Sequence, residues 1–341
     1  MSKDAIISHN SDFLFLYEAI QCNPNGDIDQ ENKPRMDYDT QTNLVTDVRV
    51  KRYIRDFLKT QNHDIFVDME GENKVSPDSK LKAVLQRLLA EPGEAKSVFE
   101  GRDDLAAKFD EIQKKSPEKS PEGLIKFLQD KKNKELCSEV NRGLLAYLVR
   151  QKFIDIRFFG SAFAIEGFTK SYVGPIQLNW GYSLHKVQLM ESNSIVTIMN
   201  DGSSTIGKDY RVHYSLLAFS GAINKYAAVG TGLTDSDLTI FRKAIWESIP
   251  ALPTRSKLNQ YPKLYVEVVY NNGFHNGHFG DLRQHISVKP KAGLDEKQIR
   301  KFDDLDLELS ALRNVLKDQI GADKPVKQVI VNSANGVQFS L

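Results

Sequence analysis

The chain has little cysteine, no long apolar run and almost no net charge. Its 341 residues include only Cys22 and Cys137, so we expect neither a disulfide framework nor a thiolate zinc site. No stretch approaches the roughly 20 apolar residues that a bilayer-spanning helix needs. The first residues (MSKDAIISHNSD) lack the basic and then apolar pattern of a secretion signal. These absences predict a cytoplasmic protein with no membrane partner.

The near-zero charge argues at first against a nucleic-acid partner. The chain has 46 Lys and Arg residues against 45 Asp and Glu residues, whereas nucleic-acid-binding chains are usually strongly basic. The charges are segregated, however. Residues 49–59 carry five basic residues and one acidic residue, residues 141–230 carry nine and five, and residues 61–140 carry 14 and 17. Local basic regions can therefore exist in this neutral chain, and RNA is not excluded.

The apolar patterns predict an α+β protein. Strands are expected at residues 13–20, 153–160, 176–189, 210–220, 263–270 and 326–331, and helices at 47–59, 81–89, 142–150, 235–249 and 296–318. The turn-rich residues 190–209 fit a protruding hairpin, and the highly charged residues 61–140 fit a helical insertion. Without the insertion the order is β-α-β-β-α-β, the ferredoxin-like scaffold that RNA-recognition modules also use.

The helix expected at residues 47–59 gives the clearest functional signal. At 100° per residue, its apolar side chains gather on one side, while Lys51, Arg52, Arg55 and Lys59 gather on the other, with Arg49 at the margin. Such cations can meet successive phosphates of a nucleic acid and release counterions. The alternative is an ordinary solvated helix face.

Two loop features have competing interpretations. Residues 23–27 (NPNGD) could present backbone N–H groups to a phosphate, but a tight turn is favoured. Asp27, Asp29, Asp37 and Asp39 could bind a divalent cation or place a carboxylate near an RNA phosphate. Their spacing is not that of a calcium loop, so solvated loop acids are favoured.

Other motifs point to no particular chemistry. Residues 230–232 (GTG) lack the third glycine of a dinucleotide loop, and His275, His278 and His285 lack a regular metal-ligand spacing. The sequence shows no Ser-His-Asp or Cys-His arrangement typical of a catalytic nucleophile with its base, and no phosphate-binding loop that ends in Gly-Lys-Ser/Thr. We therefore expect no enzyme, no cofactor and no metal.

A specific series of segments carries a family resemblance. It comprises residues 13–16 (FLFL), 23–27 (NPNGD), 32–35 (NKPR) and 44–55 (LVTDVRVKRYIR), with supporting matches at 155–160 (DIRFFG), 174–177 (GPIQ) and 228–237 (AVGTGLTDSD). This series resembles the backbone subunit of type I CRISPR surveillance (Cascade) complexes, the Cas-seven family. It is most similar to the I-B branch, and the I-C branch is also similar.

The resemblance implies a modified RNA-recognition fold shaped like a hand. The palm would be residues 1–60 and 141–290, the helical insertion 61–140, the thumb hairpin 190–209, and the C-terminal helix and strand 291–341. Copies would polymerise head to tail along one CRISPR RNA, with the thumb displacing a nucleotide at intervals and leaving the other guide bases free to pair with target DNA. The thumb residues expected are Ile198 and Met199. The expected RNA contacts are Lys51, Arg52, Arg55, Arg49, Arg35, Asn25, Gly26, Arg157, Gln177 and Lys225.

The implied partners are CRISPR RNA, further copies of the chain and the other Cascade subunits. Those subunits are a Cas-five type cap, a large subunit, a small subunit and the endonuclease that processes the repeats. Two other functions stay open. Related backbone subunits of type III complexes cut RNA with an aspartate, for which Asp27, Asp29 or Asp37 would be the candidates here. A scaffold made by protein contacts alone is the third hypothesis.

Overall fold

The computed structural model describes residues 5–70, 73–74, 76–200, 203–291 and 293–341. It confirms a mixed fold, 40% helical and 27% strand. The chain divides into two compact units. The first comprises Met1–Ile7, Leu58–Pro175 and Tyr226–Leu238, and the second comprises Ser8–Phe57, Ile176–Lys225 and Thr239–Leu341.

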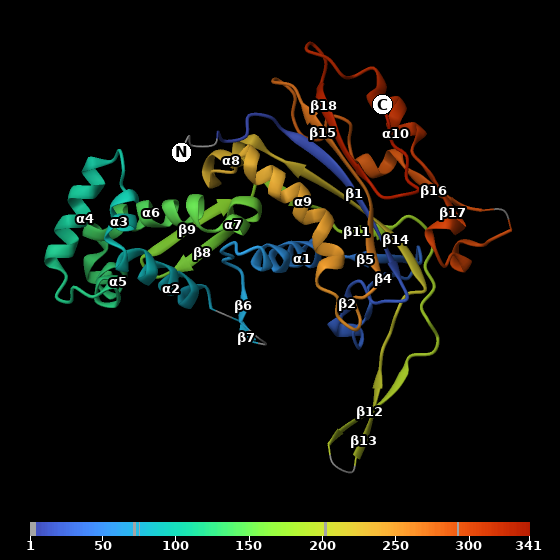
Figure 1. The fold of residues 1–341 in the computed structure, drawn as a ribbon, viewed down its shortest axis with the longest axis horizontal. Helices are drawn as coiled ribbons and strands as arrows, with labels where there is room; N and C mark the ends of the chain where they lie inside the picture. Colours follow the sequence, from blue (N-terminus) through green and yellow to red (C-terminus); the bar gives the residue numbers. More distant parts are fainter. Residues whose placement is uncertain (1–4, 71–72, 75, 201–202, 292) are drawn as a thin grey trace. The chain divides into compact units, whose positions relative to one another are not determined.

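An eight-stranded sheet forms the centre of the second unit (Figure 1). Its strands are, in spatial order, β18 (Val326–Ser333), β15 (Gln260–Tyr270), β1 (Ser11–Ile20), β14 (Tyr214–Ile223), β11 (Gly181–Ser183), β5 (Thr42–Val45) and β4 (Met36–Asp37), with β10 (Ile176–Leu178) also paired to β14. β1 is antiparallel to both of its neighbours. The strands predicted at residues 13–20, 210–220, 263–270 and 326–331 are confirmed.

The central strand β1 is apolar because side chains cover both of its faces. Leu14 and Leu16 belong to a core that also contains Leu312 of α10 (Ser310–Lys317). On the other face, the ring of Phe13 lies 5.7 Å from that of Phe241 in α9 (Asp235–Ala251). A strand covered on both faces needs apolar residues at consecutive positions, which explains the unbroken FLFLY run. The helices predicted at 47–59 and 235–249 are confirmed as α1 (Asp47–Thr60) and α9.

Smaller elements decorate the second unit. β2 (Gly26–Asp27) forms a short hairpin with β3 (Lys33–Pro34), and β16 (Ser287–Pro290) pairs antiparallel with β17 (Leu305–Glu308). The hairpin expected at 190–209 is present as β12 (Ser194–Asn200) paired antiparallel with β13 (Ser203–Lys208), outside the main sheet. Its residues 201–202 lie outside those that the structure describes. Single turns of 3₁₀-helix are η1 (Ile28–Gln30), η3 (Leu282–His285), η4 (Glu296–Gln298) and η5 (Phe302–Asp304).

The first unit is mainly helical. Its helices are α2 (Pro77–Ala90), α3 (Pro92–Ser97), α4 (Asp103–Lys115), α5 (Pro121–Gln129), α6 (Lys134–Gln151), α7 (Ile154–Phe159) and most of α8 (Lys225–Thr231), with η2 (Lys131–Asn133). Two hairpins, β6 (Met69–Glu70) with β7 (Asn73–Lys74) and β8 (Gly160–Ile165) with β9 (Phe168–Val173), complete it. Leu85, Leu124 and Leu144 belong to one buried cluster. The helices predicted at 81–89 and 142–150 are confirmed, with longer bounds.

The strand predicted at residues 153–160 is wrong, because this segment forms the helix α7. The carboxylate of Asp155 is fully buried and accepts hydrogen bonds from the backbone N–H groups of Phe66 (2.8 Å) and Val67 (3.1 Å). Gly160 then ends the helix with φ of 69°, a left-handed conformation that favours glycine. Burial from several sides gave this short helix a strand-like apolar run.

Two further predictions are wrong in extent. The strand expected at 176–189 is interrupted after Leu178, and only β10 and β11 form. The helix expected at 296–318 is confined to α10, and η4, η5 and β17 occupy the residues before it. In that segment β17 pairs with β16, a contact that local periodicity does not encode.

None of the helices in the described parts of the chain is long and apolar enough to cross a bilayer.

Candidate nucleic-acid interface

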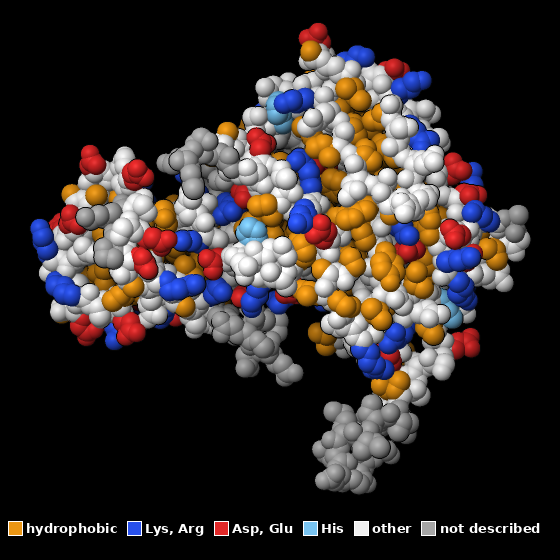
Figure 2. Space-filling model, viewed as in Figure 1, with side chains coloured by type: hydrophobic (Ala, Val, Ile, Leu, Met, Phe, Trp, Pro, Cys, Tyr) orange, Lys and Arg blue, Asp and Glu red, His pale blue; other side chains and the backbone are white. Residues whose placement is uncertain are grey.

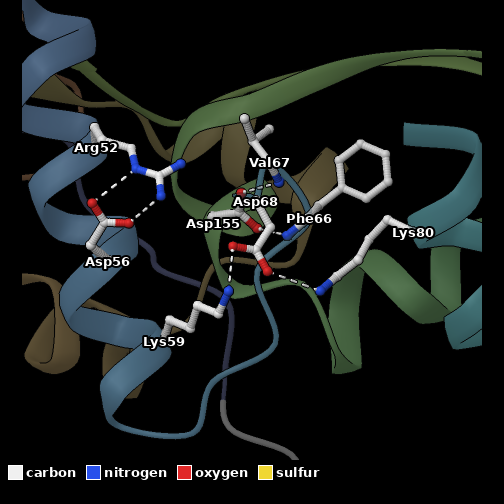
Figure 3. Close-up of polar contacts among 8 residues, drawn as sticks. All are labelled: Arg52, Asp56, Lys59, Phe66, Val67, Asp68, Lys80 and Asp155. Atoms are coloured by element: carbon white, nitrogen blue, oxygen red, sulfur yellow. Dashed lines mark hydrogen bonds and ion pairs between the residues drawn. The ribbon is translucent and has the colours of Figure 1, made fainter. Parts of the chain in front are cut away.

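Helix α1 has the amphipathic form that the sequence predicts. Val50 and Ile54 are fully buried, whereas Lys51 and Arg52 are half-buried. Lys51 Nζ lies 2.9 Å from Asp47 Oδ2, and Arg52 binds both carboxylate oxygens of Asp56 (Figure 3). The Lys51 pair is largely shielded from solvent, with side chains 13% and 20% exposed, whereas the Arg52 pair is more open, at 29% and 31%. A solvent-accessible pair four residues apart contributes only a few tenths of a kcal/mol, roughly, so Arg52 can exchange its carboxylate for a phosphate at little cost.

The turn at residues 23–27 is fastened to the start of α1. Asn25 Oδ1 accepts hydrogen bonds from the backbone N–H (2.9 Å) and the hydroxyl (3.0 Å) of Thr46. Thr46 Oγ1 accepts in turn from the N–H of Arg49 at 3.2 Å, which caps the helix. A Cβ on Gly26 would lie 1.9 Å from Asn32 Oδ1, so a larger residue there would force the Asn32 side chain to move. The favoured interpretation of this segment, a tight turn, agrees with these contacts.

Arg35 joins the same turn. Its backbone N–H donates to the Asn25 carbonyl at 3.0 Å, and its Nη1 lies 3.2 Å from Asp27 Oδ2. Arg35, from a separate segment of the motif series, is therefore brought to Asn25 and Gly26 beside the first turn of α1.

The acids of this loop organise turns. Asp27 accepts from the N–H of Asp29 at 3.3 Å, and Asp37 accepts from that of Asp39 at 3.0 Å. A hydrogen bond from the hydroxyl of Thr40 is the main cause that holds the pKa of Asp37 below its usual value. Within the described ranges, no group of three or more His, Cys, Asp and Glu residues is placed to hold a metal ion.

Two further cations lie behind the turn. The guanidinium of Arg49 stacks 4.1 Å from the centre of the Tyr53 ring, and its Nε is buried without a hydrogen-bond partner among the residues that the structure describes. Lys257, which the sequence interpretation missed, donates from Nζ to the carbonyl of Asn23. Burial, followed by the charge of Arg49, lowers the pKa of Lys257 to about 8. No local sequence signal marks Lys257, because it lies in a polar loop about two hundred residues beyond α1.

Asp209 ties the base of the β12–β13 hairpin to the loop that carries Lys257. Its Oδ2 lies 2.8 Å from Arg211 Nη2 and 2.9 Å from Arg255 Nη2. Arg211 also donates to the carbonyl of Gln21 at 2.9 Å. The hairpin base, the end of β1 and the Lys257 loop are thus joined through charged side chains.

Arg157, another predicted RNA contact, lies in the first unit with its charge compensated. Its Nε and Nη2 bind the two carboxylate oxygens of Asp237 at 2.8 and 2.9 Å. The side chains are 12% and 7% exposed. Figure 3 shows Asp155 of the same motif, together with Asp68, whose carboxylate pairs with Lys59 and Lys80. These contacts stabilise the fold, and the RNA contact of Arg157 stays a prediction.

The remaining predicted residues lie elsewhere in the second unit. Gln177 of β10 lines an open surface hollow of about 590 Å³, and Lys225 Nζ donates to Asn272 Oδ1 at 3.1 Å. The side chains of Ile198 and Met199 in β12 lie outside what the structure describes. His285 shares a hydrogen bond with the Phe279 carbonyl, and His278 packs edge-on against Phe279, so both histidines serve their loop.

Basic and acidic side chains are interspersed on the face drawn in Figure 2. No patch of one sign dominates that face, in keeping with the chain's net charge of +1.

Comparison with known proteins identifies the family. The family described as CRISPR-associated protein Cas7 matches residues 9–310. The chain belongs to the Cas7 family. A CRISPR-associated protein Cas7 from Haloferax volcanii is 28% identical over 303 residues, which cover 82% of this chain and 75% of the relative. A solved chain from a "CRISPR RNA-guided surveillance complex, pre-nicking" shares the fold of this Cas7-family chain. The TM-score is 0.53 at 14% identity, over 97% of this chain and 94% of the other.

Proposed function

We propose that this chain binds CRISPR RNA as a repeating backbone subunit of a type I surveillance complex, of the I-B or I-C kind. The observation that carries the proposal is the Cas7-family match over residues 9–310. The cations on α1 add physical support, because the more open of their ion pairs, that of Arg52 with Asp56, can be exchanged for a phosphate contact. The other Cascade subunits named above would be its partners, and the complex would act in the cytoplasm.

The proposed palm is a ferredoxin-like domain made from residues 1–60 and 141–290. In its support, β1, α1, β10 with β11, β14, α9 and β15 follow the order β-α-β-β-α-β, and β1, β14 and β15 pair antiparallel. Residues 61–140 would be an insertion, and residues 291–341 a C-terminal addition. The β12–β13 hairpin would be the thumb, with Ile198 and Met199 displacing a nucleotide.

A backbone subunit must accept any guide sequence. Its contacts should therefore go to phosphates and sugars, while base pairing supplies specificity for the target DNA. The proposed contacts are Lys51, Arg52, Arg55, Arg49, Arg35, Asn25, Gly26, Arg157, Gln177 and Lys225. Head-to-tail association of copies is a heterologous interface that does not close, and it yields a filament along the RNA.

Charge reversal on α1 tests the proposal. The triple variant Lys51→Glu, Arg52→Glu and Arg55→Glu should keep its circular dichroism spectrum but copurify with little or no CRISPR RNA. A matched control reverses three exposed lysines, Lys243→Glu, Lys291→Glu and Lys317→Glu, and should retain RNA as the wild type does. Equal RNA retention by both triple variants would show that α1 does not hold the guide.

The proposed role is non-catalytic. Asp27 and Asp37, candidates for a ribonuclease, cap turns in their loop, which supports that proposal. Incubating the assembled complex with complementary RNA and magnesium distinguishes the two functions, since regularly spaced cuts would establish a ribonuclease. A protein-only scaffold would instead assemble undiminished after nuclease treatment.

A further inference from the structure

We propose that Lys257 and Arg49 form a phosphodiester-binding site beside the turn at residues 23–27, next to the other cations of α1. This inference rests on the proposed RNA-binding function and adds to it a residue from the loop between α9 and β15. The site would hold one phosphate of the RNA backbone between an ammonium and a guanidinium.

Lys257 and Arg49 are linked through Tyr53 and Gln260. The Tyr53 ring lies 4.1 Å from the Arg49 guanidinium, and Gln260 Nε2 donates to the Tyr53 hydroxyl (3.1 Å) and to the Lys257 carbonyl (2.8 Å). After burial, the charge of Arg49 is the main influence that lowers the pKa of Lys257. The groups that act on Lys257 within the described part of the chain are Arg49 and Cys22, and neither is a carboxylate. Burial raises the pKa of the Cys22 thiol to about 12, and the Tyr17 hydroxyl nearby also has a raised pKa, so both are neutral at pH 7.

Partly buried like charges are unfavourable unless an anion compensates them. Elsewhere in the second unit, arginines that are buried or partly buried have such partners. Arg242 binds the carboxylate of Glu267, and Arg283 binds that of Asp281. Lys257 and Arg49 differ in this respect, because neither has a carboxylate partner among the described residues, and an anion from outside the chain would supply the missing charge.

The donors that remain suit a phosphate. Lys257 Nζ carries up to three N–H groups, and the Asn23 carbonyl accepts one of them. Arg49 is held in orientation by the Tyr53 ring, and its buried Nε makes no hydrogen bond within the described ranges of the chain. A phosphodiester offers two charged oxygens that can accept from both groups at once. Two cationic side chains do not coordinate a metal cation, so the ligand that fits them is an anion.

The position of the site fits a continuous RNA path. Asn23 belongs to the same turn whose Asn25 side chain holds Thr46 at the start of α1. Arg49 lies in the first turn of α1, and Lys51, Arg52 and Arg55 follow along it. A strand of RNA following α1 would therefore reach the Lys257 site at the end where the turn is anchored.

Salt-dependent binding of RNA tests this site. Full-length protein, freed of nucleic acid, is titrated against a labelled single-stranded RNA of mixed sequence by fluorescence anisotropy at several KCl concentrations. Each phosphate contact contributes about 0.7 to the slope of log K against log salt for a single strand. Lys257→Met should lower the slope by about 0.7 and weaken binding by about tenfold. Lys257→Arg should retain most of both.

The control is Lys243→Met, an exposed lysine on α9 that lies 3.8 Å from Glu247. It should leave affinity and slope unchanged. Wild-type affinity and slope in Lys257→Met would overturn the site while leaving the proposed function intact. Failure of the wild-type protein to bind RNA at all would instead overturn the proposed function.

A second measurement covers the case in which Lys257→Met does not fold. A limiting amount of an acylating reagent at pH 8 should label Lys257 of the wild-type chain readily, because its lowered pKa leaves much of the amine neutral. Bound RNA should protect Lys257 and leave the labelling of Lys243 unchanged. Equal labelling of Lys257 with and without RNA would contradict the proposal.

Discussion

The Arg157 motif in the first unit and the Lys257 region in the second unit differ in whether a partly buried charge has a partner of opposite charge. Arg157 is matched by both carboxylate oxygens of Asp237, and Asp155 of the same motif is matched by two backbone N–H groups. For Lys257 and Arg49, by contrast, the described part of the chain offers no carboxylate partner, and the charge of Arg49 helps to lower the pKa of Lys257. A compensated charge serves the fold, whereas an uncompensated one lowers the stability of the free chain and is available to a ligand.

This difference distinguishes charged motifs that stabilise the fold from charged motifs that are available to bind a ligand. The sequence DIRFFG carries an arginine as prominent as those of α1, and the family resemblance marks both segments as RNA contacts. Only the structure shows that the Arg157 guanidinium is already bound bidentately, so that any RNA contact would compete with Asp237. Four substitutions test the comparison, and they follow in order of expected effect.

Asp237→Ala should lower the free energy of unfolding by about 3–5 kcal/mol, because it leaves the buried Arg157 charge without a partner. Urea denaturation measures the loss. The control is Asp56→Ala, which frees the more exposed Arg52 and should cost less than about 1 kcal/mol. If the two substitutions lower the free energy of unfolding equally, the Arg157–Asp237 pair does not stabilise the fold more than a surface ion pair does.

Asp155→Ala should destabilise the chain by about 2–3 kcal/mol, because two buried backbone N–H groups lose their acceptor. The amides of Phe66 and Val67 should then exchange with solvent faster, which hydrogen–deuterium exchange can follow. Asp155→Asn keeps one acceptor oxygen and should fall between the wild type and Asp155→Ala. Unchanged exchange at both amides in Asp155→Ala would contradict this role.

Lys257→Met should have the opposite effect to the two aspartate substitutions. It should raise the free energy of unfolding at pH 7 in the absence of RNA. The lowered pKa, about 8 against an ordinary 10.5, means that the penalty for the charged lysine is fully present below pH 8. Between pH 8 and 10.5 the unfolded chain binds a proton that the folded chain has lost, so wild-type stability rises with pH there.

We expect a gain of about 1–2 kcal/mol at pH 7, reduced from the full shift by partial solvation and by the lost hydrogen bond to Asn23. The difference between the two proteins should shrink from pH 8 to 10.5 in urea titrations at fixed pH. A variant that is less stable than the wild type at pH 7 would show that Lys257 is a structural residue, like Arg157.

Thr46→Ala should cost about 1 kcal/mol by removing the cap of α1. It also removes the hydrogen bond that the Thr46 hydroxyl donates to Asn25 Oδ1, so the turn at residues 23–27 should become less rigid. Thr46→Ser keeps the hydroxyl and is the matched control. Thermal unfolding measures the cost, and equal melting temperatures for the two variants would rule out the cap.

Several elements of the fold can be predicted from the sequence because one local pattern determines each. The unbroken apolar run of β1 and the two-sided pattern of α1 both follow from which faces are buried. Helix α7 could not be predicted in the same way. Its apolar run is compatible with a strand, and the contact that fixes it joins Asp155 to a backbone segment about ninety residues earlier.

The residues of the candidate interface likewise differ in whether a local sequence pattern reveals them. The cations of α1 are visible in the sequence because they share one helix face. Lys257 stands alone in a polar loop, and its relation to Arg49 arises only because β15 folds back beside β1. Ion pairing is likewise invisible in the sequence, so Arg157 and Arg52 appear equivalent there although their exposure and partners differ.

The ion pairs of Asp209 have a consequence for how this chain can change over generations. Asp209 binds Arg211 at the base of the hairpin and Arg255 in the loop that leads to Lys257. Loss of its carboxylate would leave two neighbouring arginines repelling each other, so a viable lineage would have to replace one of them as well. Among Cas7-family sequences, the residues aligned with 209, 211 and 255 should therefore covary, and a hairpin exchanged between two relatives should function best when the 254–257 loop is transferred with it.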